Sequence, residues 1–171
     1  NGNGTKYGDE VAFSTPVPFV CGTNTVSDYE GHIYNTVQIG DQCWMKENLK
    51  TTHYSDGWPI EEGGAQPSSE IALYYYPDNS TSNKDFYGLL YNWKAVMREE
   101  EPSNTVPSGV QGICPEGWHM PSDEEWTVLK DFVGAQAEYR CEGSTQNVLS
   151  ALADSVGWDS VGGDIAKFRF D

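Results

Sequence analysis

The sequence predicts a loop-rich fold of the α+β or β-rich class, in which aromatic side chains supply much of the core. Hydrophobic residues make up only 37% of the chain and form no long run of Leu, Ile or Val, whereas glycine occurs 18 times. Aromatic residues are abundant, with 10 Tyr, 6 Trp and 6 Phe, so we expect them to build much of the core. Short segments with strand alternation and short segments with helical spacing follow one another along the chain.

Residues 1–18 differ from the rest and predict a strand followed by a linker. Tyr7, Val11 and Phe13 alternate with other residues, and two prolines then end the strand. A single strand does not fold alone. The segment YGDEVAFSTP resembles the last strand of fibronectin-III-like repeats of bacterial surface proteins. Residues 1–18 are therefore interpreted as the end of such an upstream domain, and residues 19–171 as a domain of their own.

The clearest strand signal in the chain is a pair of hairpins. A strand at Thr25–Ser27 is followed by a turn at Asp28–Gly31 and by alternating apolar residues within Ile33–Ile39. A second turn at Gly40–Asp41 leads to a strand at Cys43–Met45. We expect these strands to pair as neighbours.

Further elements are expected in the second half of the chain. The run LYYYP predicts a strand at 73–77, and FYGLLYNWKAVMRE predicts a short helix at 86–99. Ser122 is predicted to cap the next helix, because Glu125 three positions later completes a capping box. A last short helix is expected at 145–156. The face of the capped helix at helical spacing comprises Trp126, Leu129, Lys130 and Val133.

The stretch GICPEGWHMPSDEEWTVL gathers a cysteine, a histidine and three consecutive acidic residues. The acidic run is explained by the favourable charge at a helix start, which we weigh above an acid–base catalytic pair. Cys114 has no adjacent basic residue to lower its pKa, so a catalytic thiol is disfavoured. His119 is expected to be a half-buried strand residue more often than a metal ligand, because His32 and His53 lie far away in sequence.

Charge and cysteine content exclude several classes of function. The formal net charge is −16, which opposes binding to nucleic acid or to anionic lipid surfaces. No apolar run approaches the length of a membrane span, so no membrane insertion of this segment is expected. The four cysteines form no CxxC pair, which disfavours a structural zinc site, and their even number favours an oxidising compartment.

Four blocks together resemble a known family. VSDYEGHIYNTVQIGDQCWMKENLKT, YYYPDN, YGLLYNWKAVM and GVQGICPEGWHMPSDEEWTVL are similar, in this order, to the Fibrobacter succinogenes major paralogous domain, over residues 19–158. That domain is common in surface lipoproteins of Bacteroidetes. The GWHMPSDEEW block also resembles formylglycine-generating-enzyme domains. The resemblance implies a C-type-lectin-like α+β fold, in which short helices pack on small, twisted antiparallel sheets joined by long loops.

The resemblance also assigns structural roles. It implies that Trp118 and Met120 lie on a strand entering the core, that Pro121–Ser122 form a corner, and that Trp126 and Leu129 pack the helix on the sheet. Trp44 and Trp93 are likewise expected to be structural.

The closing elements of the family, including the expected partner of Cys114, do not follow in this chain. We therefore expect a truncated domain, or one completed by another chain. Cys21–Cys43 is the favoured disulfide. Cys114–Cys141 is the alternative, and sequence alone does not fix the connectivity.

The functional expectation is a non-enzymatic binding or adhesion module of a bacterial surface protein, located outside the cell or on the outer membrane. Its partner would be a glycan or a surface protein. Candidate sugar-stacking residues are Trp58, Tyr74, Tyr75 and Tyr76, although they are equally suited to a core. No cofactor is expected, apart from a possible calcium ion at DNSTSNKD (78–85), where a solvated turn is the favoured interpretation.

Two other functions are weighed against this one. The first is a structural domain of a surface filament or assembly, which self-associates or is completed by another chain. The second is an enzyme of the formylglycine-generating type, disfavoured because the cysteine pair of that chemistry has no matching segment here. The repeated DSV pattern adds Ser155 and Ser160 as candidate O-glycosylation sites, a pattern used for exported Bacteroidetes proteins.

Overall fold

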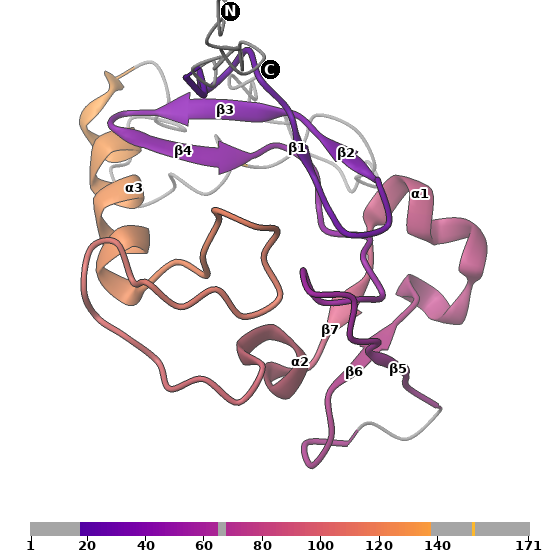
Figure 1. Ribbon diagram of the computed structural model, residues 1–171. Helices are drawn as coiled ribbons and strands as arrows, with labels where there is room; N and C mark the ends of the chain where they lie inside the picture. Colours follow the sequence, from indigo (N-terminus) through magenta and orange to yellow (C-terminus); the bar gives the residue numbers. More distant parts are fainter. Residues whose placement is uncertain (1–17, 65–67, 138–151, 153–171) are drawn as a thin grey trace, which may run out of the picture.

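The computed structural model describes residues 18–64, 68–137 and 152, and it has the α+β, loop-rich architecture that the sequence predicts (Figure 1). Its elements are short, and long irregular segments connect them. The strands are β1 Val26–Ser27, β2 Ile33–Tyr34, β3 Thr36–Ile39, β4 Gln42–Met45, β5 Glu61–Glu62, β6 Leu73–Tyr75 and β7 Leu90–Tyr91. The helices are η1 Pro77–Asn79, η2 Thr81–Asn83, α1 Lys84–Tyr87, α2 Trp93–Met97 and α3 Asp123–Ala135.

The two predicted hairpins are confirmed. β1 pairs with β2 in antiparallel register, with Val26 opposite Tyr34, and β3 pairs with β4, with Val37 opposite Trp44. Gly40 makes the tight turn between β3 and β4 at φ +61°, a backbone conformation that favours glycine. The Cys21–Cys43 disulfide, predicted from the sequence, ties the chain before β1 to β4.

The third sheet is small and mixed, with strand order β5-β6-β7. β5 runs parallel to β6, so the expectation of purely antiparallel sheets is wrong at this place. β6 pairs with β7 in antiparallel register, with Tyr75 opposite Leu90. The predicted strand at 73–77 is confirmed in its first three residues.

The predicted single helix over 86–99 is wrong. Gly88 ends α1 at φ +74°, and β7 then pairs with β6 before α2 begins. The side chain of Asn92 caps α2 by accepting the backbone N–H of Ala95, and Asn92 also binds β6 through the N–H of Leu73. Sheet pairing therefore overrides a spacing that by itself suits a helix.

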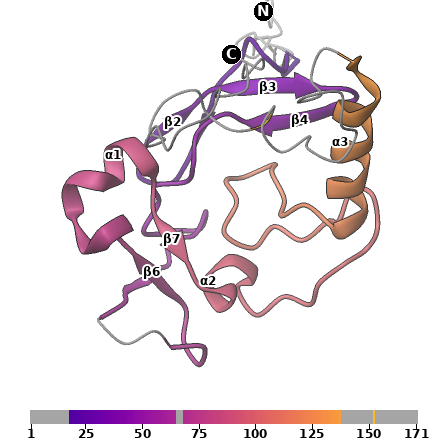
Figure 2. The ribbon, with the colours of Figure 1, turned by 180° about the vertical axis from the view of Figure 1, so that it is seen from behind.

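Helix α3 begins as predicted, with Ser122 and Glu125 forming a complete capping box. Leu129 and Val133 are buried and pack against Ile39 of β3. Figures 1 and 2 show α3 beside one end of the β3–β4 hairpin, while α1 and the β5–β7 sheet lie toward the other end of the molecule. Of the predicted helix 145–156, only Leu152 is described, and it packs against the same cluster.

A second core cluster lies between β6, α2 and the loops, and it consists of Tyr54, Ile60, Tyr74, Leu89, Ala95 and Ile113. Trp93 and Trp126 do not belong to either buried cluster, because 65% and 52% of their surfaces are exposed. Trp126 still packs α3 on the β3–β4 hairpin as expected, because its ring centroid lies 4.8 Å from that of Trp44. The exposure of Trp93 does not support the structural role expected for it. The segment with Trp118 and Met120 is not a strand, although the N–H of Met120 donates to the carbonyl of Val110.

Candidate functional site

The four residues predicted to stack on sugars do not form one surface. Trp58 is strongly exposed, with 69% of its surface accessible. Tyr74 is buried in the core with 8% exposure, so of the two alternatives that the sequence left open the core one applies there, while Tyr75 and Tyr76 are half-buried. The Tyr76 ring packs edge-on against Tyr74, with 5.8 Å between the ring centroids. The alternation within LYYYP did not reveal that strand β6 has both faces covered.

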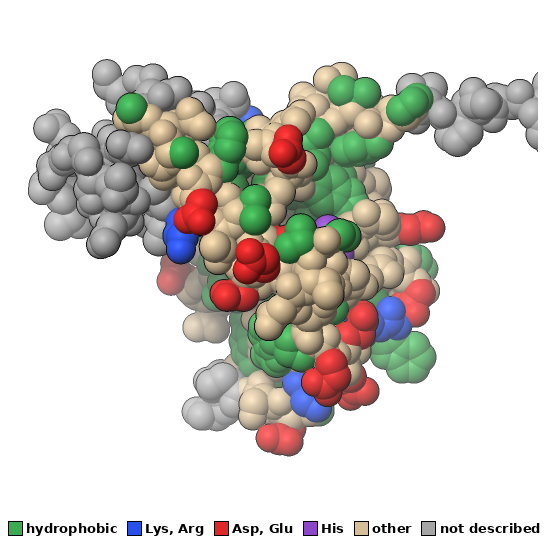
Figure 3. All heavy atoms as spheres, turned by 90° about the vertical axis from the view of Figure 1, so that its left-hand side faces the viewer, with side chains coloured by type: hydrophobic (Ala, Val, Ile, Leu, Met, Phe, Trp, Pro, Cys, Tyr) green, Lys and Arg blue, Asp and Glu red, His purple; other side chains and the backbone are tan. Residues whose placement is uncertain are grey.

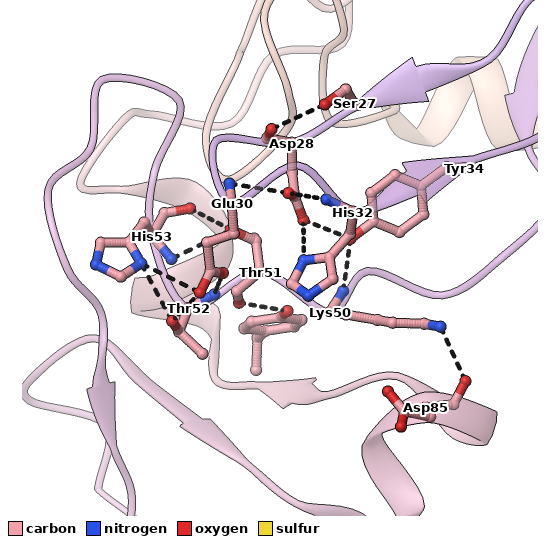
Figure 4. Close-up of polar contacts among 11 residues, drawn as sticks. Ser27, Asp28, Glu30, His32, Tyr34, Lys50, Thr51, Thr52, His53 and Asp85 are labelled. Atoms are coloured by element: carbon pink, nitrogen blue, oxygen red, sulfur yellow. Dashed lines mark hydrogen bonds and ion pairs between the residues drawn. The ribbon is translucent and has the colours of Figure 1, made fainter.

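A polar cluster surrounds the β1–β2 turn (Figure 4), and the sequence did not single it out. Asp28, Glu30 and His32 place one potential metal-ligand atom each within 4.8 Å of one another. Nδ1 of His32 lies 2.8 Å from Oδ2 of Asp28, and the hydroxyl of the fully buried Tyr34 donates to the same oxygen at 2.7 Å. His53 lies 3.5 Å from Glu30.

The carboxylate oxygens of this cluster already have protein donors. Oδ1 of Asp28 accepts the backbone N–H groups of Glu30 and His32. Glu30 accepts the N–H and the hydroxyl of Thr52, and these bonds outweigh the effect of burial and lower the pKa of its carboxyl. A metal ion would have to replace these hydrogen bonds. We therefore interpret the cluster as a structural link that holds the β1–β2 turn against residues 50–53.

The loop considered for calcium is folded into the short helices η1 and η2. Asp78 adopts a left-handed conformation at φ +53°, and the hydroxyls of Ser80 and Ser82 lie 2.8 Å from each other. Among the described residues, the group of His, Asp and Glu side chains with metal-ligand spacing is the one at Asp28.

A cleft of about 800 Å³ lies between β4, the 106–121 loop and the start of α3. Its wall is rich in aromatic side chains. Trp44 and Trp126 lie with their ring centroids 4.8 Å apart, and Trp118 packs edge-on against Phe19 at 6.1 Å. Figure 3, viewed from the α3 side of the molecule, shows hydrophobic and acidic side chains intermixed on the surface. We take this aromatic cleft as the candidate functional site.

The cleft also contains polar and charged groups. Asp41, Glu47, Glu116 and Glu125 line it, together with His119, and the described residues on its wall include no Lys or Arg. Nε2 of His119 lies 2.8 Å from Oε1 of Glu125, so this histidine is paired with a carboxylate. Two polar atoms on the wall residues, Oε1 of Gln42 and Nε1 of Trp44, are buried without a hydrogen-bond partner.

Unpartnered buried polar atoms cost about 1–3 kcal/mol each relative to satisfied ones. Gln42 uses its Nε2 to donate to the carbonyl of Glu125, which leaves Oε1 as a spare acceptor. Trp44 contributes a spare donor from the next position on the same side of β4. In the described part of the cleft wall, one buried acceptor and one buried donor therefore have no hydrogen-bond partner within the protein.

Cys114 lines the cleft but is unsuited to nucleophilic chemistry. It is buried and carries a free thiol, and burial raises its pKa to about 12, so the thiol stays protonated at neutral pH. Sγ of Cys114 lies 3.5 Å from Sδ of Met120. Its alternative partner Cys141 lies outside the described residues, as do Ser155, Ser160 and nearly all of the 1–18 segment.

Comparison with known proteins gives the chain a family. A sequence model of the Fibrobacter succinogenes major domain matches residues 37–164, which is most of the chain. The chain belongs to the Fibrobacter succinogenes major domain family. Searches of curated proteins and of solved structures found no match. The C-type-lectin-like fold therefore stays a prediction, and the function has to be argued from the site.

The match helps to choose between the two clusters. Every lining residue of the aromatic cleft except Phe19 falls within the part of this Fibrobacter succinogenes major domain that the family model covers. Asp28, Glu30 and His32 precede that part. The cleft is thus built by the family domain itself, whereas the polar cluster lies on the segment that leads into it.

Proposed function

We propose that this Fibrobacter succinogenes major domain is a non-enzymatic, extracytoplasmic binding module of a bacterial surface protein, and that it binds a glycan in the aromatic cleft. The observation that carries the proposal is the cavity of about 800 Å³ walled by Trp44, Trp118 and Trp126. Ligand sites are typically concave, largely apolar and equipped with a few polar groups. Flat aromatic rings stack on the apolar faces of sugar rings at a low cost in conformational entropy.

The polar groups of the cleft support binding rather than catalysis. Glu125 holds the start of α3 and accepts the N–H groups of Ser122 and Ser108, and its contact with His119 belongs to the same network, so we assign this carboxylate a structural role. The thiol of Cys114 is held protonated by burial. These features disfavour an enzyme of the formylglycine-generating type, whose chemistry depends on reactive cysteines.

The disulfide supports the location outside the cytoplasm. Disulfides such as Cys21–Cys43 form and persist in oxidising compartments. Among the residues that the structure describes, no helix is long and apolar enough to cross a membrane. The exposed Asp41 and Glu116 and the net charge of −16 suit a domain that faces solvent.

The test is an array of immobilised glycans, followed by calorimetric titration with each glycan that binds. Trp126→Ala removes an exposed cleft ring and is expected to weaken binding by tenfold or more, because truncating a tryptophan that anchors a bound partner typically costs about 2 kcal/mol or more. Trp93→Ala is the matched control, because Trp93 is 65% exposed and lies outside the cleft. Loss of binding in both variants, or an array without any binding, would overturn the proposal.

A second candidate is a structural role in a surface assembly, which an exposed apolar edge favours. Strand β7 is an edge of its sheet, and Leu90 on it is 57% exposed. Uncovered apolar strand edges promote association. Sedimentation of the wild type and of Leu90→Lys tests this role. A concentration-dependent oligomer that the lysine abolishes supports it, and a monomer at all concentrations refutes it.

A further inference from the structure

The aromatic cleft has an unbalanced charge. Of the four carboxylates on its wall, Glu125 is paired with His119, and Glu47 accepts the backbone and side-chain N–H groups of Asn35. Asp41 and Glu116 are exposed. No Lys or Arg stands among the described residues that line the cleft, and the chain as a whole carries a formal charge of −16. The cleft therefore repels anionic ligands and attracts cationic ones.

The aromatic walls suit a cation as well. The negative face of a tryptophan ring attracts an ammonium group, an effect of about 0.5–2 kcal/mol that grows when water is excluded. The Trp44 and Trp126 rings meet at 41° with centroids 4.8 Å apart, and they form one corner of the cleft. Trp118, held edge-on by Phe19, belongs to the same cavity. In such a cleft, an organic ammonium ion is stabilised both by the faces of the tryptophan rings and by the negative charge of the carboxylates.

The unpartnered atoms indicate what else the ligand carries. Oε1 of Gln42 needs a donor, and Nε1 of Trp44 needs an acceptor. A hydroxyl group donates and accepts, so a sugar can serve both atoms once small side-chain rotations uncover them. The side chains of Lys and Arg only donate, so a basic side chain leaves the indole N–H of Trp44 without a partner.

We propose that the aromatic cleft is specific for a cationic glycan, an oligosaccharide of amino sugars with free ammonium groups. This inference rests on the proposed function and names its ligand class. The ammonium groups lie against the faces of Trp44 and Trp126 and near Asp41 and Glu116. The hydroxyls meet Gln42 and the indole N–H of Trp44. Uronic acids, sialic acids and phosphorylated sugars are rejected by the same carboxylates.

The experiment compares two ligands with the same sugar backbone, one bearing free ammonium groups and the other neutral acetamido groups. The β-1,4-linked glucosamine tetramer and its fully N-acetylated form are titrated calorimetrically at about pH 6, where an amine is protonated. The inference requires the free-amine tetramer to bind at least about tenfold more tightly, a difference of about 1.4 kcal/mol. Its affinity should fall as salt is raised, because ions screen the exposed carboxylates.

Charge-removing variants locate the effect. Glu116→Gln and Asp41→Asn keep the shapes of the side chains and are expected to weaken the free-amine tetramer several-fold, while binding of the acetylated tetramer is unaffected. Glu61→Gln on β5 is the control, because Glu61 is exposed and does not line the cleft. It should leave both affinities unchanged.

The outcomes separate this inference from the proposed function. If the acetylated tetramer binds as well as the free amine, or if only other glycans of the array bind in the cleft, the charge specificity is wrong and glycan binding stands. If a tetralysine peptide competes as strongly as the glucosamine tetramer, the cleft recognises positive charge alone. The inference that it is specific for a cationic glycan is then wrong. If no glycan binds at all, both proposals fall together.

Discussion

Nε2 of His119 lies 2.8 Å from Oε1 of Glu125, and this contact joins the loop before α3 to the first turn of the helix. Oε2 of the same carboxylate accepts the backbone N–H groups of Ser122 and Ser108. One buried side chain thus fixes the helix start and one wall of the aromatic cleft. Burial raises the pKa of Glu125, but the bonds from Ser122, His119 and Ser108 outweigh it and hold the pKa below its ordinary value.

Glu125→Gln should lower the free energy of unfolding by about 1.5–3 kcal/mol at pH 6, because bonds to a charged acceptor are lost. A carboxyl with a lowered folded-state pKa stabilises the protein fully above its unfolded pKa, near 4.5, and loses this effect as the pH falls through the folded value. The difference between wild type and variant should therefore shrink from pH 6 toward pH 3. Urea denaturation across this range measures it.

Glu124→Gln is the matched control for this prediction. Glu124 is exposed in the same helical turn, so its substitution should change stability by no more than about 0.5 kcal/mol. Some acid sensitivity should remain in Glu125→Gln, because the pKa of Glu30 is also lowered. A wild type and a Glu125→Gln variant that differ equally at pH 6 and pH 3 would contradict the role given to the charge.

The helix start is the part of this site that the sequence predicts fully. Ser122 and Glu125 are three positions apart, and a capping box is a local interaction that spacing alone reveals. The Trp44–Trp126 contact joins residues 82 positions apart, and no local pattern encodes it. Trp126 was expected to pack the helix on the sheet, but apolar spacing indicates a face and does not say which residue covers it or how much of the ring stays exposed.

The same reasoning explains the other differences between prediction and structure. FYGLLYNWKAVM has helical spacing, but pairing of β7 with β6 satisfies the backbone there instead. Tyr74 was ambiguous in sequence because tyrosine suits a core as well as a surface, and only the packing of Leu89 and Ala95 around it decides. The Asp28 cluster joins the β1–β2 turn to Thr52, a contact that becomes visible only in three dimensions.

Tyr34→Phe should destabilise the domain by about 1–3 kcal/mol, because the buried Asp28 carboxylate loses one donor and the N–H of Lys50 loses its acceptor. The Tyr34 hydroxyl donates to Oδ2 of Asp28 at 2.7 Å and accepts the N–H of Lys50 at 2.9 Å, and the side chain is fully buried. Tyr29→Phe is the control, since Tyr29 is 59% exposed. Equal unfolding midpoints for the two variants in urea would show that the hydrogen bonds of the Tyr34 hydroxyl do not stabilise the fold.

Removal of the Cys21–Cys43 disulfide should lower the free energy of unfolding by about 3 kcal/mol, because the link closes a loop with a sequence separation of 22 in the unfolded chain. The double variant Cys21→Ala/Cys43→Ala tests this by thermal and urea denaturation. Addition of a reductant should destabilise the wild type and leave the double variant unchanged. A wild type indifferent to reductant would mean that the bond contributes nothing to stability.

Leu129→Ala should cost about 2–5 kcal/mol, whereas Val128→Ala should cost less than about 1 kcal/mol. The two residues are neighbours on α3, but Leu129 is 3% exposed and packs against Ile39, while Val128 is 42% exposed. Because Leu129 holds α3 on β3, its loss should also loosen the wall that carries Trp126 and weaken glycan binding more than Val128→Ala does. Denaturation and calorimetric titration of both variants measure the two effects. If Leu129→Ala lowers stability and leaves the affinity unchanged, the position of Trp126 does not depend on the packing of α3, and the cleft is held by its loops instead.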